Sequence, residues 1–349
     1  EGNDLRAVIE RAEQAIELGA HGEPLGLLRS MQSVACYWQG DYARAQELGM
    51  RGVEALAPGG TEWYRVLGTT IVASARRGDY DSVERWFQVA LEQAPQTTGG
   101  DAIVCLCRGC FQLIFAGRLA RADEILASIM RMVALEGGLA RLDPLTLAQV
   151  EHVHGVRAAH GGDVGRFLVH LEAAVAAFER AGDRRNVSLE RPTVGWCFAE
   201  IGMFERAEQI LVEALALADE LGAQQTITYA QVNAGYVLGL RGKTDEAIAM
   251  LERAAATCVA VGNVRLEGWA RAHISGIELR RGRPERAEAE AATAIARLEL
   301  SPGLRAWATA ERARALVALG RAPEAVAVAR EAMAKLVELG SMLQGESSP

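Results

Sequence analysis

The strongest constraint on the fold is a glycine that returns at a nearly constant interval along the 349-residue chain. Successive spacings are 38, 39, 45, 40, 40, 40 and 38 residues, and the residue five positions after each glycine is alanine in six of eight copies. Chance does not give seven near-equal intervals, and self-similarity at a fixed period indicates a repeat architecture. The eight glycines are Gly40, Gly78, Gly117, Gly162, Gly202, Gly242, Gly282 and Gly320.

Two further columns of small residues share this register. Small residues at fixed helical positions let two helix backbones approach closely, and a glycine in the left-handed conformation ends a helix. Each repeat therefore predicts a hairpin of two helices with the glycine at its turn. Seven residues before the glycines lie Ser33, Ile71, Cys110, Gly155, Gly195, Gly235, Ser275 and Ala313, and twelve residues after them lie Gly52, Ala90, Ile129, Ala174, Ala214, Ala254, Ala294 and Ala332.

The composition favours an all-α chain. Half of the residues are apolar, Ala, Leu, Glu and Arg dominate, which suits helices, and no alternating run of β-branched residues indicates a strand. We expect one more helix before the first hairpin, at 4–18, and a tail at 339–349 that begins another hairpin. The expected hairpins cover 25–56, 62–93, 101–135, 144–180, 187–220, 225–260, 264–299 and 303–338.

These columns resemble the tetratricopeptide repeat pattern, which has a small residue at position 8, Gly at 15, an aromatic residue at 17, and small residues at 20 and 27. Tyr42, Tyr80 and Phe204 fill the aromatic position, whereas Thr244 and Pro284 depart from it. The resemblance covers nearly the whole chain. It implies a right-handed αα superhelix of about eight hairpins plus a leading helix, forming a single solenoid over 1–349.

The length of the repeat is the basis of a second resemblance. A period near 40 exceeds the usual 34 residues, and it is similar to the extended repeats in the C-terminal arrays of bacterial signalling proteins. Those include serine/threonine kinases of myxobacterial type, signal-transduction ATPases and transcription regulators. Neither end of the chain reads as a polar capping helix, so we expect an excised piece of a longer polypeptide.

The family resemblance also implies a binding groove, because the first helix of each hairpin lines the concave surface of such superhelices. Aromatic and Arg side chains are favoured interface anchors, and Arg65, Arg76, Arg108, Arg280 and Arg314 add charge to this face. Asn233 sits where many such repeats carry an Asn that bonds a peptide backbone. The alternative is that several rings only fill space between hairpins. The predicted groove residues are Tyr37, Trp38, Phe111, Phe115, His152, His160, Trp196, Tyr229, Asn233, Tyr236, Trp269, His273 and Trp307.

The expected function is docking of a protein or peptide partner in this groove. The alternative is a sensor that binds a small molecule or peptide effector there. A dry pocket closed by Trp196, Tyr236 and Trp269 would favour the sensor, whereas an open groove with scattered charge would favour protein binding. Exposed apolar faces on the edge hairpins allow end-to-end self-association.

No set of catalytic or cofactor-binding residues can be assembled from the sequence, so neither an enzyme nor a cofactor is expected. The one cysteine cluster, Cys105, Cys107 and Cys110, lacks the spaced pairs that give zinc four ligands, and small buried side chains explain it. His152 and His154 point to different helix faces, so no metal site is expected. Gly242-Lys243-Thr244 is a repeat turn and not a phosphate loop.

Charge, hydropathy and cysteine usage limit the classes of partner and the cellular compartment that we expect. The net charge of -8 and the pI of about 5.5 argue against nucleic acid, whose binders carry a basic face. No stretch approaches the twenty apolar residues of a membrane span. Six scattered cysteines without framework spacing suggest a reducing compartment, and we expect the cytoplasm.

Overall fold

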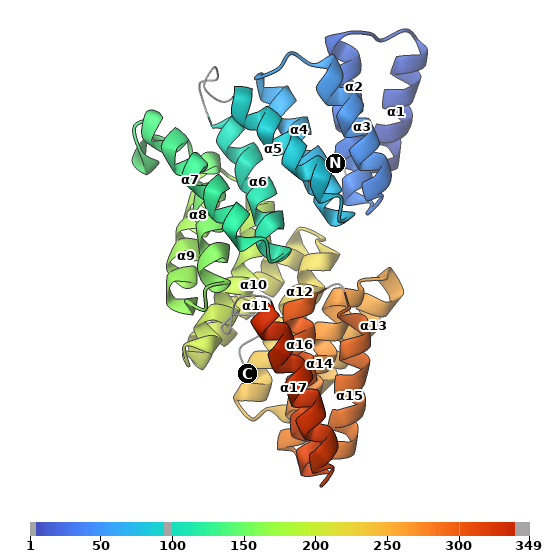
Figure 1. Ribbon diagram of the computed structural model, residues 1–349, viewed down its shortest axis with the longest axis vertical. Helices are drawn as coiled ribbons and strands as arrows, with labels where there is room; N and C mark the ends of the chain where they lie inside the picture. The colour runs from blue at the N-terminus through green and yellow to red at the C-terminus, as the bar shows by residue number, and fades with distance from the viewer. Residues whose placement is uncertain (1–4, 94–99, 300, 339–349) are drawn as a thin grey trace. The chain divides into compact units, whose positions relative to one another are not determined.

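The computed structural model describes residues 5–93, 100–299 and 301–338, and within these ranges every regular element is helical. A leading helix, α1 (Leu5–Glu17), precedes eight helical hairpins (Figure 1). This confirms the predicted all-α fold class, while the tail at 339–349 lies outside the described residues. The first helices of the hairpins, called A helices below, are α2 (Glu23–Trp38), α4 (Thr61–Arg76), α6 (Asp101–Phe115), α8 (Pro144–Ala159), α10 (Arg184–Glu200), α12 (Gln224–Leu240), α14 (Val264–Arg280) and α16 (Pro302–Ala318).

The second helices, called B helices, return beside the first. A short 3-10 helix at Leu139–Arg141 lies between the third and fourth hairpins. The B helices are α3 (Tyr42–Ala55), α5 (Tyr80–Gln93), α7 (Leu119–Leu135), α9 (Val164–Arg180), α11 (Phe204–Glu220), α13 (Thr244–Val261), α15 (Pro284–Arg297) and α17 (Ala322–Glu338).

The turn glycines end the A helices in the way that the sequence predicts. All eight have φ between 72° and 82°, a left-handed conformation that residues with a Cβ rarely adopt. At Gly202 the chain reverses with two backbone bonds, from Gly202 N to Ala199 O at 3.0 Å and from Met203 N to Phe198 O at 2.8 Å. These bonds satisfy carbonyl groups that the end of α10 would otherwise leave without partners.

The small-residue columns lie where the two helices of a hairpin cross. Ala207 and Ala247 are 0% exposed, and a Cβ added at Gly235 would come within 2.6 Å of Leu251 Cγ. Where the column holds serine, a hydroxyl joins the two helices: Ser275 Oγ donates to Ala287 O at 2.8 Å. The column positions therefore set the close approach of helices A and B.

The chain divides into two compact units, Glu1–His154 (unit 1) and Gly155–Pro349 (unit 2), with the boundary inside α8. In unit 1, α2 packs against α4 and α4 against α6. In unit 2, the A helices α10, α12, α14 and α16 each contact the next one, and α11, α13 and α15 each pack against the A helices before and after them. The prediction of one continuous solenoid over 1–349 stays a prediction.

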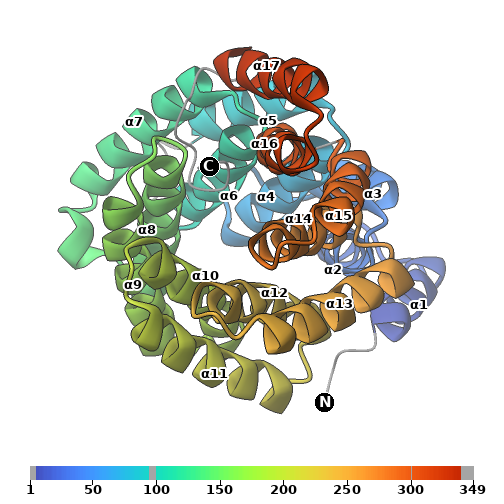
Figure 2. The same ribbon diagram turned by 90° about the horizontal axis from the view of Figure 1, so that it is seen from below.

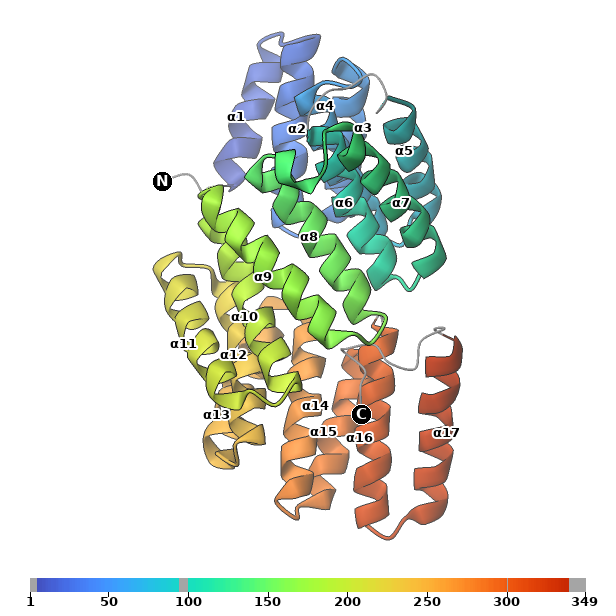
Figure 3. The same ribbon diagram turned by 90° about the vertical axis from the view of Figure 1, so that its left-hand side faces the viewer.

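Successive A helices contact one another closely in unit 2, so they form the inner layer of that unit, with α13, α15 and α17 outside (Figure 2). The side view shows α14, α15, α16 and α17 running side by side (Figure 3). The core between the layers includes Leu251, Leu266, Ile274, Ile277 and Leu298. We call the inner surface of α10, α12, α14 and α16 the A-helix face of unit 2.

Candidate functional site

Five of the predicted groove residues come together on the A-helix face of unit 2. The ring of His273 on α14 stacks on Tyr236 of α12 at 4.5 Å and lies 4.8 Å from Trp307 of α16. Trp269 lies 5.8 Å from His273 and 5.6 Å from Tyr229. We call these five side chains the ring ladder. Tyr229, Trp269 and Trp307 each lie thirteen residues before a turn glycine, which places them at the same level of successive A helices.

Two hydroxyl groups connect the ring ladder to α10. The hydroxyl groups of Tyr229 and Thr193 are 3.1 Å apart, and Tyr236 donates to Glu200 Oε1 at 2.7 Å. Burial raises the pKa of Glu200, and the bond from Tyr236 partly offsets that rise. The ring of Tyr236 is therefore held from both sides, by a carboxylate on α10 and by His273 on α14.

Three buried polar atoms on this face have no hydrogen-bond partner among the residues that the structure describes. They are Nε2 of His273, whose side chain is only 6% exposed, Oε2 of Glu311 and Oδ1 of Asn233. Burial, with a smaller effect from Arg280, lowers the pKa of His273 to about 3, so the imidazole is neutral near pH 7. Burial raises the pKa of Glu311, while Arg314, whose Nη1 donates to Glu311 Oε1 at 2.8 Å, acts in the opposite direction.

Arg280, at the end of α14, lies across two glycines of the A-helix face. A Cβ on Gly239 would be 3.4 Å from Arg280 Nη2, and a Cβ on Gly276 would be 3.8 Å from Nη1. No carboxylate of the described residues lies within ion-pair distance, 4.0 Å, of this guanidinium. Burial lowers the pKa of Arg280, and the nearby charge of Glu311 partly offsets that effect.

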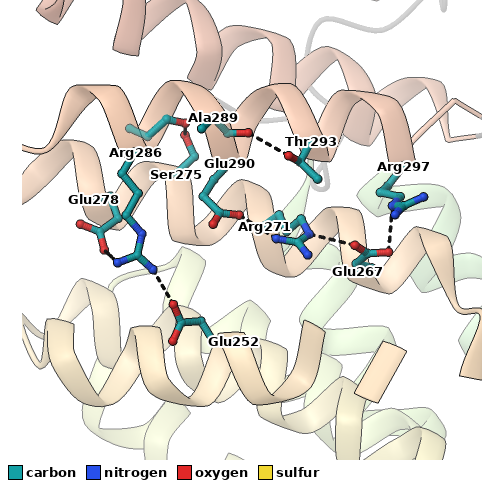
Figure 4. A network of polar contacts seen from close by, with 11 residues as sticks. Glu252, Glu267, Arg271, Ser275, Glu278, Arg286, Ala289, Glu290, Thr293 and Arg297 are labelled. Atoms are coloured by element: carbon teal, nitrogen blue, oxygen red, sulfur yellow. Dashed lines mark hydrogen bonds and ion pairs between the residues drawn. The ribbon is translucent and has the colours of Figure 1, made fainter. Parts of the chain in front are cut away.

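On the opposite side of α14, Arg271, Arg286 and Arg297 form ion pairs with carboxylates (Figure 4). Glu267 is 3% exposed and lies 2.9 Å from Arg271 Nε and 3.0 Å from Arg297 Nε. Arg271 also reaches Glu290 at 3.0 Å. These groups join α14 to α15 and stabilise the hairpin.

Three other predicted groove residues of unit 2 are buried. Asn233 is 0% exposed, and its Nδ2 donates to the carbonyl of Pro192 at 3.3 Å. The ring of Trp196 lies 6.4 Å from Phe167 of α9, and His160 Nδ1 is 3.0 Å from Val156 O in its own helix. These contacts are within the fold, and ligand binding by the three residues stays a prediction.

In unit 1 the predicted residues form two smaller groups. Tyr37 and Trp38 of α2 meet edge to face at 5.5 Å. Phe111 of α6 lies 4.6 Å from Phe115 and stacks on His152 at 5.1 Å. Trp38 is 48% and Phe115 38% exposed, which leaves part of each ring accessible.

The sequence interpretation missed the two carboxylates of the A-helix face, Glu200 and Glu311. A usable signal existed in the register: Glu311 lies nine residues before Gly320, as His273 does before Gly282 and Asn233 before Gly242. Residues that share this column share a helix face. The predicted groove includes Asn233 and His273 from this column, but no carboxylate was expected in it.

The cysteine cluster does not form a reactive site. Cys105, Cys107 and Cys110 are buried as free thiols, and burial raises the pKa of Cys105 to about 12. Over 5–93, 100–299 and 301–338, no group of three or more His, Cys, Asp or Glu side chains could hold a metal ion. Among these same residues, no helix is long and apolar enough to cross a membrane.

No protein-family model matches the sequence, and no curated protein is significantly similar to it. Solved structures share the fold. A Rap protein in complex with competence and sporulation factor matches with a TM-score of 0.67 at 14% identity, over 97% of each chain. NprR in complex with its cognate peptide NprX matches with a TM-score of 0.57 at 13% identity, over 78% of this chain and 81% of that one.

A third similar structure is a signal transduction ATPase with a tetratricopeptide repeat sensor from Pyrococcus horikoshii. Its TM-score is 0.60 at 14% identity, over 95% of this chain and 50% of that one, so this chain spans half the length of that protein. These neighbours are repeat proteins of tetratricopeptide type. The chain therefore has a tetratricopeptide-type solenoid fold, as its sequence pattern predicts.

Proposed function

We propose that this protein is a binding module that docks a peptide, or an extended segment of a partner protein, on the A-helix face of unit 2. The observation that carries the proposal is the ring ladder. Tyr229, Tyr236 and Trp307 are each half-buried, so they offer ring surface to a partner while their neighbours fix their orientation. Aromatic rings fixed in this way contribute much contact area at low entropic cost.

The polar groups around the rings support an extended chain as the ligand. A peptide backbone presents donors and acceptors at short intervals, and this face offers Glu200, Arg280 and Arg314 beside the rings. NprR, which shares the fold, was solved with its cognate peptide, and a Rap protein of the same fold was solved with competence and sporulation factor. The charged rim distinguishes this face from the closed apolar pocket that a small-molecule sensor needs.

The test uses an array of short random-sequence peptides with free C-termini, probed with the full chain and with Trp307→Ala and Trp38→Ala variants. We expect wild type to select peptides, Trp307→Ala to weaken their binding about tenfold or more, and Trp38→Ala in unit 1 to leave it unchanged. Circular dichroism checks that each variant keeps its helix content.

The outcomes separate the parts of the proposal. If only Trp38→Ala weakened peptide binding, the docking site would lie in unit 1. If all three proteins bound peptides equally well, the ring ladder would not be part of the binding interface. If wild type instead bound no peptide but bound a hydrophobic dye in a way that depends on Trp307, that result would favour a small-molecule sensor over a peptide-binding module.

A further inference from the structure

A hollow of about 240 Å³ lies between α16 and α17, away from the ring ladder. Thr309 lines the hollow, while the residues two positions before and after it, Trp307 and Glu311, lie on the A-helix face. Side chains two residues apart on a helix point to nearly opposite sides. The hollow is smaller than the roughly 300–1,000 Å³ of pockets for drug-sized ligands, so it suits a metabolite of few atoms.

The same place in the α14–α15 hairpin is filled by charged groups of the chain itself (Figure 4). There the carboxylate of Glu267 lies 2.9 Å from Arg271 and 3.0 Å from Arg297. Glu267 lies 15 residues before its turn glycine, and Arg297 lies 15 residues after it. In the next hairpin these two columns hold Arg305 and Lys335, which both line the hollow. The α16–α17 hairpin therefore has two cations beside an open space where its neighbour has a buried carboxylate.

Two carboxylates stand at the rim of the hollow. Arg305 Nη2 is 3.6 Å from Glu331 Oε1, which is longer than a hydrogen bond, and Lys335 Nζ is 2.9 Å from Glu338 Oε2. The side chains of the two cations are 40% and 39% exposed, against 62% and 68% for the two carboxylates, so the cations lie deeper. Ion pairs as exposed as these contribute little to stability, and a ligand can therefore replace them.

This arrangement favours a small ligand that carries both signs of charge. The two deeper cations favour a carboxylate, whose two oxygens accept charge-assisted hydrogen bonds. The carboxylates at the rim favour an ammonium group and repel a doubly charged anion. An α-amino acid has its carboxylate and its ammonium group on one carbon, so it presents the two charges side by side, as the hollow does.

The rest of the wall is apolar and made of small side chains. Ala306, Ala332 and Ala334 line it, and the first two are only 2% and 5% exposed. A short aliphatic side chain placed against these methyl groups would leave water without displacing any of them. The wall therefore favours an amino acid with a small apolar side chain over one with a long or charged side chain.

We propose that the α16–α17 hollow binds a free amino acid, with its carboxylate on Arg305 and Lys335 and its ammonium group toward Glu331 and Glu338. The site is separate from the peptide-docking face and goes beyond the proposed function. Both sites share α16, but they use opposite sides of that helix.

The first test measures the melting temperature of the full chain with each common L-amino acid at millimolar concentration. A ligand that binds only the folded chain raises the melting temperature, and we expect small aliphatic amino acids to raise it most. The affinity of the best one is then measured by isothermal titration calorimetry. The same titration is made with its carboxylic acid analogue, which lacks the amino group, and its amine analogue, which lacks the carboxylate. Each analogue should bind about tenfold more weakly or worse.

Two pairs of variants locate the site. Lys335→Gln should weaken binding of the amino acid about tenfold or more, whereas Arg253→Gln, exposed on the outer helix α13, removes one positive charge elsewhere and should match wild type. Ala334→Leu places a larger side chain in the hollow and should abolish binding. Ala327→Leu makes the same change at another exposed position of α17, outside the hollow, and should leave binding unchanged.

Four results would overturn the inference. They are a melting temperature that no amino acid raises, an analogue that binds as tightly as the amino acid, equal affinities for Lys335→Gln and Arg253→Gln, and equal affinities for Ala334→Leu and Ala327→Leu. None of them bears on peptide docking, because that is measured with peptides and with Trp307→Ala on the other side of α16.

Discussion

At the scale of single residues, His273 makes the clearest link between burial and pH. Its pKa is about 3 in the folded chain, against 6.5 for an unperturbed imidazole. Below pH 6.5, His273 is protonated in the unfolded chain but stays neutral in the folded chain until the pH approaches 3. The free energy of unfolding is therefore unaffected by His273 above pH 6.5. As the pH falls from 6.5 toward 3, it decreases by up to about 1.4 kcal/mol per pH unit.

We predict that the free energy of unfolding of wild type falls more steeply between about pH 7 and about pH 5 than that of His273→Gln, which lacks the titrating group. Urea unfolding at several pH values measures both slopes. Glu200 and Glu311 have raised pKa values and act in the opposite direction, but they are present in both proteins. Parallel slopes for wild type and variant would show that His273 is accessible to protons in the folded chain.

At the scale of the helical hairpin, the crossing point of helices A and B limits side-chain size. Ala247 is 0% exposed at the start of α13, in the column five residues after a turn glycine. We predict that Ala247→Leu overpacks this crossing and destabilises the protein by about 1–3 kcal/mol. Ala256→Leu, at an exposed position of the same helix, should change stability by less than about 0.5 kcal/mol. Thermal unfolding measures the stability of both variants. Equal melting temperatures for the two variants would show that Ala247 does not lie at the helix crossing.

The hairpins were predictable because their determinants are local. The turn glycine, the small columns and the aspartates that follow several turns act within one repeat, so the period alone reveals them. Asp41 is an example: it follows Gly40 and accepts a hydrogen bond from Arg44 N at 3.1 Å, which caps α3.

The partners of the inner side chains were less predictable, because they depend on how neighbouring hairpins rotate against each other. The sequence placed Trp196 and Tyr236 on one face, yet Trp196 packs against Phe167 while Tyr236 bonds Glu200. The period gives the face of a helix, and it does not say which residue of the next helix lies opposite.

At the scale of the whole molecule, contacts run mainly between neighbouring helices within each unit. In repeat proteins of this kind, stability is close to a sum of hairpin terms and nearest-neighbour terms. A local defect should therefore open the hairpins around it and leave distant ones closed, with the opening measurable by amide hydrogen exchange.

Glu267 offers the sharpest test of this locality, because its buried carboxylate holds Arg271 and Arg297 across the α14–α15 hairpin. Removing it leaves Arg297 without a carboxylate and Arg271 with Glu290 alone, which costs about 1–3 kcal/mol. We predict that Glu267→Ala speeds exchange most in α14 and α15, less in α13 and α16, and not at all in α2 to α4 of unit 1. Glu285→Ala, exposed on the same hairpin, serves as the control and should match wild type. Uniform acceleration along the chain would mean that the hairpins unfold as one cooperative body, because a local loss would then be shared by every helix.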